Sequence, residues 1–530
     1  MSSRSSFFRK IVYLVVIAAL LLPLRWLSHP ATIAFKDVPA SPGGKLAQLR
    51  DQYHLSQAQL GQIDPASVTI KLATLGMRGV AANILWEKAN DFKMKKDWTN
   101  LGATLNQITK VQPNFINVWS NQAWNLSYNV SVEFDDYRQR YRWVMKGIDF
   151  LKEGIRYNER QPRLLWDVGW TISEKIGRAD ESKQFRKLFK EDDDFHGSRP
   201  LALRDNWVVG KEWFERVVEA VEQGQTMIGK SPLIYRSSGP MAQMYYADAL
   251  EQDGTFGEVA KSAWVTSAHD WHDYGNKDIL TTFQDEKTLE PIVIQLNQQE
   301  SHEQAARKLV QQLDALQPGL REKIMADKRK ALTPAQREAL DTPAAKRSAK
   351  QFELAAQADE AVKVTDNELA RKIADPKQKK EALKLAKDIR QHQLLVSYIE
   401  RYRSIVNFVY WRLRAEVEQT DEILATHKLI YQGNRAYSEG DLVAARNDYQ
   451  QGLAGWRKVI DRAPGILSDQ TTSDELMDVI KRYRRILGQL DEKFPQPFIL
   501  QDVIDAHERT PAAPPKKEEP KGSGEKKPSK

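Results

Sequence analysis

The stretch that decides the fold is THKLIYQGNRAYSEGDLVAARNDYQQGLAGWRKVIDRAP, residues 426–464. Small residues recur along it, and a glycine–aspartate pair, Gly440 and Asp441, divides it into two parts. Small side chains let two antiparallel helices approach closely, while an aromatic side chain fills the space above them. A glycine followed by an aspartate suits an exposed turn. The stretch therefore predicts a helical hairpin.

This stretch resembles a tetratricopeptide (TPR) helical hairpin. The resemblance places Gly433, Ala436 and Tyr437 on the first helix and Gly440 in the turn. It also implies which residues of the second helix pack against the first: Ala445, Tyr449, Gly452 and Leu453. Proteins built from such hairpins stack them into extended surfaces.

The chain departs from the TPR pattern in two respects. A TPR usually has a proline soon after its second helix, whereas here the helix is expected to run on through Ile460 before Pro464. A looser copy lies at 241–263 and a fainter one at 79–113, and no constant period of 34 residues connects the units. The sequence therefore predicts irregular TPR-like hairpins and not a regular superhelix.

Helical patterns extend on both sides of this hairpin. Apolar residues step by four and three along 395–413, which predicts a coiled-coil-type seam that pairs within the chain and not between two copies. Thr333 with Gln336, and Asp375 with Gln378, have the spacing of helix starts, each with a proline at the first helical position. A further break is expected at 237–240, where serines precede Gly-Pro.

Eleven of the fourteen tryptophans lie between residues 45 and 275. Buried tryptophan dominates packing in helical arrays, so an aromatic core is the simpler interpretation. The alternative is a groove that binds peptides or sugars. Its candidate residues are two pairs of tryptophans: Trp119 with Trp124, and Trp166 with Trp170.

The chain begins with a basic segment and an uncharged apolar run, residues 11–24, that is closed by Arg25. A run of this length fits either a signal peptide or a signal anchor. No small-x-small cleavage pair follows, so we expect residues 1–28 to be a cytoplasmic n-region and a retained transmembrane anchor. More basic residues precede the run than follow it, which favours an extracytoplasmic location for the rest of the chain.

The fold class expected from these patterns is all-α, an irregular TPR-like α-solenoid of helical hairpins with one N-terminal transmembrane anchor. Strand-like alternation is scarce. The expected segments after the anchor are a tryptophan-rich domain (45–275), a charged helical region (290–394), a helical region with the TPR-like hairpin (395–495) and a disordered Lys/Pro/Glu tail (509–530).

Composition excludes several chemistries. The chain has no cysteine, which rules out disulfides, thiolate metal sites and a cysteine nucleophile. Its 79 basic and 71 acidic residues give a net charge of +8, but the signs alternate along the chain. This pattern is typical of solvated helix faces and not of a nucleic-acid-binding stripe.

Residues 224–231, GQTMIGKS, match the phosphate-loop pattern letter for letter. A working phosphate loop follows a buried β-strand, because its backbone N–H groups must converge on the phosphate. The preceding residues, 214–221, have the pattern of an amphipathic helix, and Pro232 follows at once. We therefore expect a loop between two helices.

The remaining leads are equally weak. His269 and His272 could share a helix face and ligate a metal with Asp273, but surface histidines at a helix end explain them better. The sequence contains no G-x-S-x-G nucleophile elbow and no glycine-rich dinucleotide loop. It does not exclude a pair of catalytic carboxylates. We expect no catalytic residue, no cofactor and no metal.

At a larger scale the chain resembles an uncharacterised family of planctomycete-type membrane-anchored proteins. The features that carry this resemblance are the N-terminal anchor, residues 205–213 (DNWVVGKEW) and residues 402–412 (YRSIVNFVYWR). Some of its members are named "IRE (iron responsive element)", but nothing in these residues supports RNA or iron binding. The resemblance implies a membrane protein and no particular reaction.

The sequence favours a membrane-anchored helical-repeat scaffold for protein–protein interactions in the cell envelope over an enzyme. Its expected partners are the membrane, through the N-terminal helix, and proteins that the sequence does not identify. The alternative is a glycan-active enzyme or glycan-binding protein on an all-α toroid, for which two convergent carboxylates in a pocket would be diagnostic.

Overall fold

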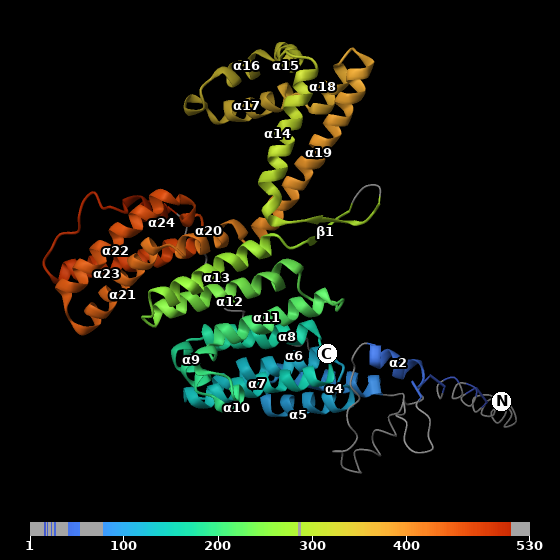
Figure 1. Ribbon diagram of the computed structural model, residues 1–530, viewed down its shortest axis with the longest axis vertical. Coiled ribbons are helices and arrows are strands. Elements are labelled where there is room, and N and C mark those ends of the chain that lie inside the picture. The colour runs from blue at the N-terminus through green and yellow to red at the C-terminus, as the bar shows by residue number, and fades with distance from the viewer. Residues whose placement is uncertain are drawn as a thin grey trace, which may run out of the picture. The chain divides into compact units, whose positions relative to one another are not determined.

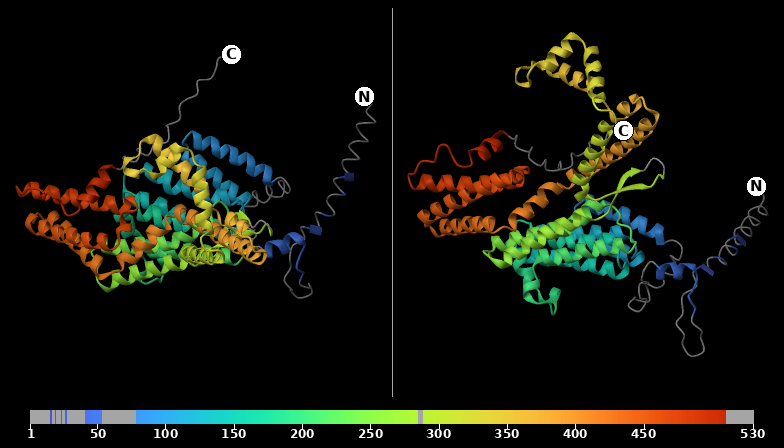
Figure 2. Two further views of the ribbon diagram at one scale, coloured as in Figure 1. Left: turned by 90° about the horizontal axis from the view of Figure 1, so that it is seen from above. Right: turned by 45° about the horizontal axis from the view of Figure 1, so that its top comes forward.

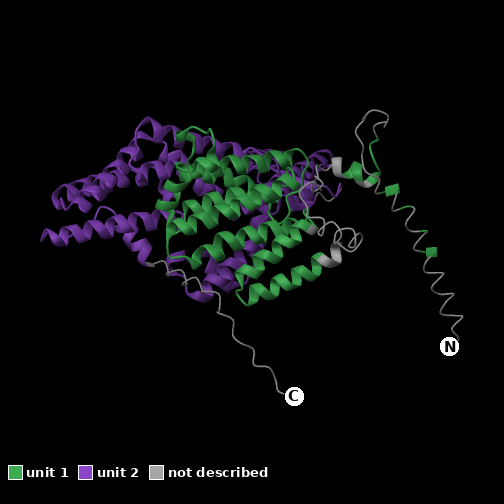
Figure 3. Cartoon of the chain, turned by 90° about the horizontal axis from the view of Figure 1, so that it is seen from below, with its two compact units in different colours: residues 1–246 green, residues 247–530 purple. Residues whose placement is uncertain are grey.

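The computed structural model describes residues 41–52, 78–284 and 288–509, together with positions 15, 16, 19, 23, 26 and 27. The chain divides into two compact units, residues 1–246 and 247–530 (Figure 3). The described part of both units consists mainly of α-helices (Figure 1), which confirms the predicted helical class. The predicted tail, 509–530, lies outside the described residues except for its first position.

The predicted membrane anchor also falls almost entirely outside the described residues. Among those that are described, no helix combines the length and the apolar character needed to cross a bilayer.

The described part of unit 1 is a series of helices. These are α2 (Lys45–Gln52), α4 (Arg78–Met94), α5 (Trp98–Val111), α6 (Ile116–Trp124), α7 (Tyr137–Tyr157), α8 (Pro162–Trp170), α9 (Ser182–Lys190), α10 (Asp193–His196), α11 (Asn206–Glu222) and the first part of α12 (Pro232–Gln252). Asn125–Val130 and Thr171–Ile176 are π-helical turns that continue α6 and α8.

The core of unit 1 forms where α6, α7 and α8 pack. The apolar stripe of α7 buries Ile148 and Leu151 beside Trp119. Gly154 of α7 faces the indole of Trp119 so closely that a Cβ would lie 2.8 Å from it. Small and aromatic residues at this crossing therefore set how near the helices approach.

The helix break expected at 237–240 is wrong. Helix α12 runs without interruption from Pro232 to Gln252, with Pro240 inside it. The hydroxyls of Ser237 and Ser238 donate to the carbonyl of Ile234, at 3.1 and 2.9 Å. The helix continues because apolar residues on either side of Pro240 are buried. This packing outweighs the loss of the backbone hydrogen bond that proline cannot donate.

Unit 2 contains longer helices and one small sheet. Its elements are the end of α12, α13 (Glu258–Gly275), β1 (Ile279–Gln284), β2 (Pro291–Ile294), α14 (Gln299–Leu316), α15 (Leu320–Ala331), α16 (Pro334–Asp341), α17 (Ala349–Val362), α18 (Asp366–Lys372), α19 (Pro376–Ile405), α20 (Phe408–Glu418), α21 (Asp421–Glu439), α22 (Leu442–Arg462), α23 (Gln470–Gln489) and α24 (Gln501–Arg509). The two strands are antiparallel, with Ile279 opposite Ile294.

Helices α14 and α19 lie side by side and antiparallel, as Figures 1 and 2 show. Leu313 of α14 and Ala382 and Ile389 of α19 are buried in their shared core. Both predicted helix starts in this region are confirmed. Thr333 forms a complete capping box with Gln336, and the carboxylate of Asp375 accepts the backbone N–H of Gln378.

The continuous seam expected over 395–413 is wrong, because the helix stops within it. Helix α19 ends at Ile405, and α20 begins at Phe408 after Asn407 adopts a left-handed conformation with φ of 49°. Asparagine tolerates this conformation better than most residues. Its side-chain amide donates to Asp469 at 2.7 Å, and Phe408 is fully buried, so tertiary contacts hold the break.

Helices α21 and α22 form an antiparallel hairpin. Gly440 ends α21 with φ of 87°, and the carboxylate of Asp441 caps α22 by accepting the N–H of Ala444 at 2.9 Å. Gly433 lies against the ring of Tyr449, where a Cβ would be 3.2 Å from the ring. Four further residues pack in or against the same core, with Ala436 only partly buried: Ala436, Ala445, Gly452 and Leu453.

Candidate functional site

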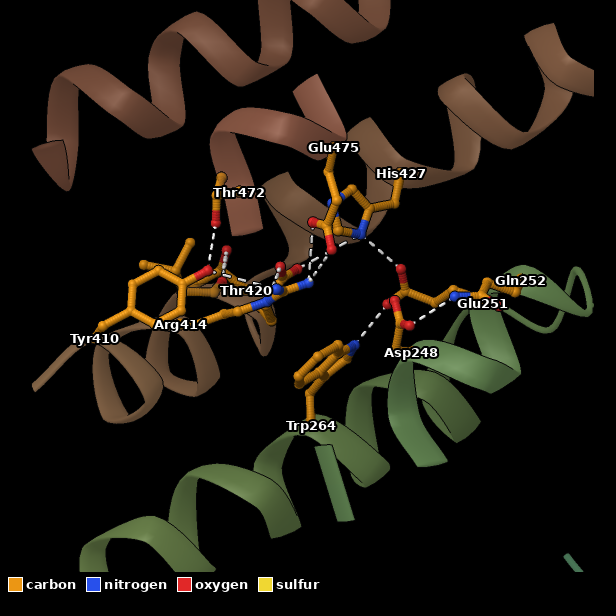
Figure 4. Close-up of polar contacts among 12 residues, drawn as sticks. Asp248, Glu251, Gln252, Trp264, Tyr410, Arg414, Thr420, His427, Thr472 and Glu475 are labelled. Atoms are coloured by element: carbon orange, nitrogen blue, oxygen red, sulfur yellow. Dashed lines mark hydrogen bonds and ion pairs between the residues drawn. The ribbon is translucent and has the colours of Figure 1, made fainter. Parts of the chain in front are cut away.

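Charged side chains gather inside unit 2 in what we call the ionic cluster (Figure 4). The helices that supply this cluster are α12, α13, α20, α21 and α23, which lie up to about half of the chain apart in the sequence. The members of the ionic cluster are Asp248, Glu251, Trp264, Tyr410, Arg414, Glu418, His427, Thr472 and Glu475.

One half of the ionic cluster is centred on Glu251. Its carboxylate accepts the indole N–H of Trp264 at 2.6 Å, and its other oxygen lies 2.6 Å from Nδ1 of His427 (Figure 4). The imidazole also lies against the indole of Trp456, with ring centroids 5.3 Å apart and the rings tilted. Glu251 thereby joins α12 to both α13 and α21.

The other half is centred on Arg414. Its Nη2 donates to both carboxylate oxygens of Glu475, at 3.2 and 3.1 Å. Its Nε lies 3.6 Å from Glu418, one helical turn away. Tyr410 shares a hydrogen bond of 2.7 Å with Thr472. This half therefore joins α20 to α23.

Carboxylates outnumber cations in the ionic cluster. Only Arg414 and His427 oppose the four acidic residues. Glu418 is 1% exposed, and burial raises its pKa to about 7, although His427 and Arg414 both act to lower it. Burial likewise raises the pKa of Asp248 to about 6, against the attraction of Arg414. The excess of buried acid means that the cluster retains protons near neutral pH.

His427 is held as a cation. Burial alone would lower the pKa of its imidazole, but the carboxylates of Glu418 and Glu251 outweigh that effect and raise it to about 9. A histidine in this state donates hydrogen bonds and is not a free base at neutral pH. Its contact with Glu251 is therefore an ion pair, and its contact with Glu418 becomes one when that carboxyl ionises.

Two buried atoms of the ionic cluster have no hydrogen-bond partner among the described residues, Nε of Arg414 and Oε2 of Glu418. Each still lies within 3.6 Å of an opposite charge. Charge attraction at these distances compensates only part of the cost of desolvation. The cluster is therefore sensitive to the loss of either of its cations, Arg414 or His427.

A surface pocket of about 480 Å³ opens elsewhere on the same helices. It lies between the α12–α13 turn and the first turns of α21, and none of its lining residues belongs to the ionic cluster. The residues that line this surface pocket are Gly254, Phe256, Gly257, Glu258, Lys261, Asp421, Leu424, Ala425 and Lys428.

The surface pocket combines an apolar wall with charges at its edge. Phe256 packs edge-on to Tyr431 at 5.6 Å, and Leu424 is 6% exposed. Lys261 and Asp421 form an ion pair of 2.8 Å. Such a mixture suits a side chain or peptide segment better than a small charged metabolite.

The four predicted groove tryptophans lie in different environments. Trp119 is 1% exposed and donates its indole N–H to the carbonyl of Pro113 at 2.7 Å. Trp124 is 53% exposed and stacks on Tyr128. Trp166 is buried and stacks on Trp170, with centroids 4.8 Å apart. Trp119 and Trp166 therefore contribute to packing, and Trp124 presents an aromatic surface.

The sequence that matches a phosphate loop lies between helices α11 and α12, which confirms the predicted loop between two helices. The ammonium group of Lys230 lies 3.9 Å from the centroid of the Trp166 ring. Helix α11 directly precedes the loop where a phosphate loop needs a strand, so its backbone lacks the setting in which phosphate is bound.

The histidines near the end of α13 are exposed, as expected. His269 lies 3.1 Å from Asp273, and both side chains are more than half exposed. Within the described residues, no group of three or more histidine, aspartate or glutamate side chains could hold a metal ion.

Sequence reasoning missed the ionic cluster entirely. The only local signal was the four-residue spacing of Arg414 and Glu418, which is also common on solvated helices. Glu251 and His427 are 176 positions apart, so nothing in the sequence links them.

Comparison with known proteins does not assign this chain to a family. No protein-family model matches the chain, and no curated protein matches it significantly.

Proposed function

We propose that this protein is a membrane-anchored scaffold of TPR-like helical hairpins that binds a partner protein in the cell envelope. The observation that carries the proposal is the surface pocket, which forms where the α12–α13 turn meets the first turns of α21. Arrays of hairpins bind other proteins through grooves between neighbouring units. The occupant that fits this pocket is a peptide segment with an apolar side chain beside a charged one.

The ionic cluster supports this proposal indirectly. Except for Asp248, its charged groups pair with one another, and the whole cluster lies outside the lining of the surface pocket. Buried charges that pair in this way fix the relative positions of helices. The cluster therefore has the role of holding α12, α13 and α21 in the arrangement that forms the pocket.

The glycan-active alternative has weaker support. It needs two convergent carboxylates in an open pocket, one of them acting as an acid. The carboxylates that line the surface pocket are Glu258 and Asp421, and Asp421 is ion-paired with Lys261. The acidic residues with raised pKa, Glu418 and Asp248, do not line it.

Site-specific photocrosslinking tests the partner-binding role. A photoreactive amino acid would replace Lys428 at the pocket in the full chain, expressed in the native cell, and a matched variant would carry it at Lys323 of α15. Both positions are exposed. We expect a discrete crosslinked protein from position 428 alone, and at least a fivefold loss of that product when Phe256→Ala is added. Equal products from both positions would contradict the proposal.

A separate experiment tests the anchor. Deletion of residues 2–28 should move the protein from the membrane fraction to the soluble fraction, and protease should reach the full chain in spheroplasts. Retention of the deleted chain in the membrane fraction would show that residues 2–28 are not the anchor.

A further inference from the structure

Two histidines face each other across the α14–α19 pair. Nδ1 of His302 lies 2.9 Å from Nδ1 of His392, and the ring centroids are 5.1 Å apart. The residues are 90 positions apart in the chain, so the two helices bring them together. Both side chains are half-buried.

An imidazole pair at this distance needs one hydrogen between the two nitrogens. One Nδ1 must carry that hydrogen and donate it, while the other accepts it through its lone pair. If the donor histidine carries its proton on Nε2 instead, both Nδ1 lone pairs face the same space.

The spacing is close to that of a metal chelate. Zinc–imidazole bonds of about 2.0–2.1 Å in a tetrahedral site place the two nitrogens about 3.3 Å apart. The observed Nδ1–Nδ1 distance of 2.9 Å is therefore within a few tenths of an ångström of the distance in such a chelate, and the rings would have to turn so that both lone pairs converge on the metal. Neutral imidazoles are favoured ligands of zinc, nickel and copper.

We propose that His302 and His392 form a two-histidine site for a divalent transition metal that links α14 to α19. No third histidine or carboxylate converges with them among the described residues, so water completes the coordination. The metal links two antiparallel helices that the chain connects only through α15–α18. Its binding should therefore stabilise this helix pair.

Copper and nickel binding to the full chain, freed of any affinity tag, tests the site. With Cu²⁺ at one equivalent, the electron paramagnetic resonance spectrum of the wild type should show coupling to two imidazole nitrogens. His302→Ala and His392→Ala should each reduce Ni²⁺ affinity at least tenfold in calorimetry. In the wild type, Ni²⁺ should also slow hydrogen exchange in α14 and α19.

The matched control is the double variant His269→Ala/His272→Ala, which removes the exposed histidines of α13 and should leave binding unchanged. Circular dichroism checks that each variant keeps its helical content. The wild-type spectrum makes the test independent of whether the variants fold. Absence of two-nitrogen coupling, or equal Ni²⁺ affinity in the wild type and both single variants, would overturn the proposal.

Discussion

Helix α21 takes part in two regions of unit 2 that are stabilised in opposite ways. Toward α22 it packs through small and apolar residues such as Gly433 and Ile430. Toward α12 and α20 it presents His427 to buried carboxylates. The first region gains stability from the burial of apolar surface, and the second depends on the balance of charge. The difference predicts that mutation and pH will affect the two regions in different ways.

The largest expected effect is in the ionic cluster. Arg414→Ala leaves the buried carboxyl of Glu418 and the half-exposed carboxylate of Glu475 without their shared cation. Removing one partner from a buried ion pair, here Arg414 from Glu418, costs about 3–5 kcal/mol. Hydrogen exchange of peptides from α20 and α23 measures this loss. Arg435→Ala, which removes an exposed ion pair with Glu439, is the matched control and should cause no measurable change. If Arg414→Ala loses no more stability than the control, buried and surface charges contribute equally, which would contradict this prediction.

The hairpin interface should respond to lost volume instead. Leu453 is 1% exposed, and Leu453→Ala should destabilise the α21–α22 hairpin by about 3 kcal/mol because it leaves a cavity. Urea unfolding at pH 5 and pH 9 should give the same loss. A loss that changed strongly with pH would mean that the hairpin and the ionic cluster are not energetically separate.

The turn beside the surface pocket offers a finer comparison. Gly254 has φ of 82°, and a Cβ there would lie 2.7 Å from Cζ of Tyr431, whereas Gly440 has φ of 87° and open space around it. Gly254→Ala should therefore cost about 2–3 kcal/mol, and Gly440→Ala about 1 kcal/mol, because only the first adds a clash to the strain. Thermal unfolding of both variants measures the difference. Equal losses would show that the contact with Tyr431 relaxes freely.

The hairpin was predictable from sequence because its signals are local. Gly440 and Asp441 mark the turn, and the small residues follow at helical spacing on either side. The break at Asn407 was not predictable, because a hydrogen bond to Asp469 and the burial of Phe408 hold it. Continuity through Pro240 likewise depends on packing by distant residues.

The sequence could not predict the ionic cluster either, because contacts between distant residues form it as well. Its members are ordinary charged residues on helices whose patterns also fit solvated faces. Only the fold brings Glu251 and His427 within 2.6 Å and buries the carboxylate. The surface pocket arises in the same way, since the α12–α13 turn and α21 are more than 150 positions apart.

The pH dependence of stability follows from the same charges. The pKa of Glu418 rises from 4.5 in the unfolded chain to about 7 in the folded protein, and that of His427 rises from 6.5 to about 9. The folded state therefore binds more protons than the unfolded chain between about pH 5 and pH 9. Stability should be greatest at the acidic end of this window and fall as pH rises through it.

The most direct test of the account is the stability of Glu418→Gln at pH 5 and pH 9, measured by urea unfolding beside the wild type. The claim under test is that the ionic cluster of unit 2 carries an excess of buried acid. Glutamine resembles the protonated glutamic acid, so the variant should match the wild type at pH 5 and exceed it by about 1–3 kcal/mol at pH 9. A variant less stable than the wild type at both pH values would contradict the claim, because the ionised carboxylate would then be the stabilising form.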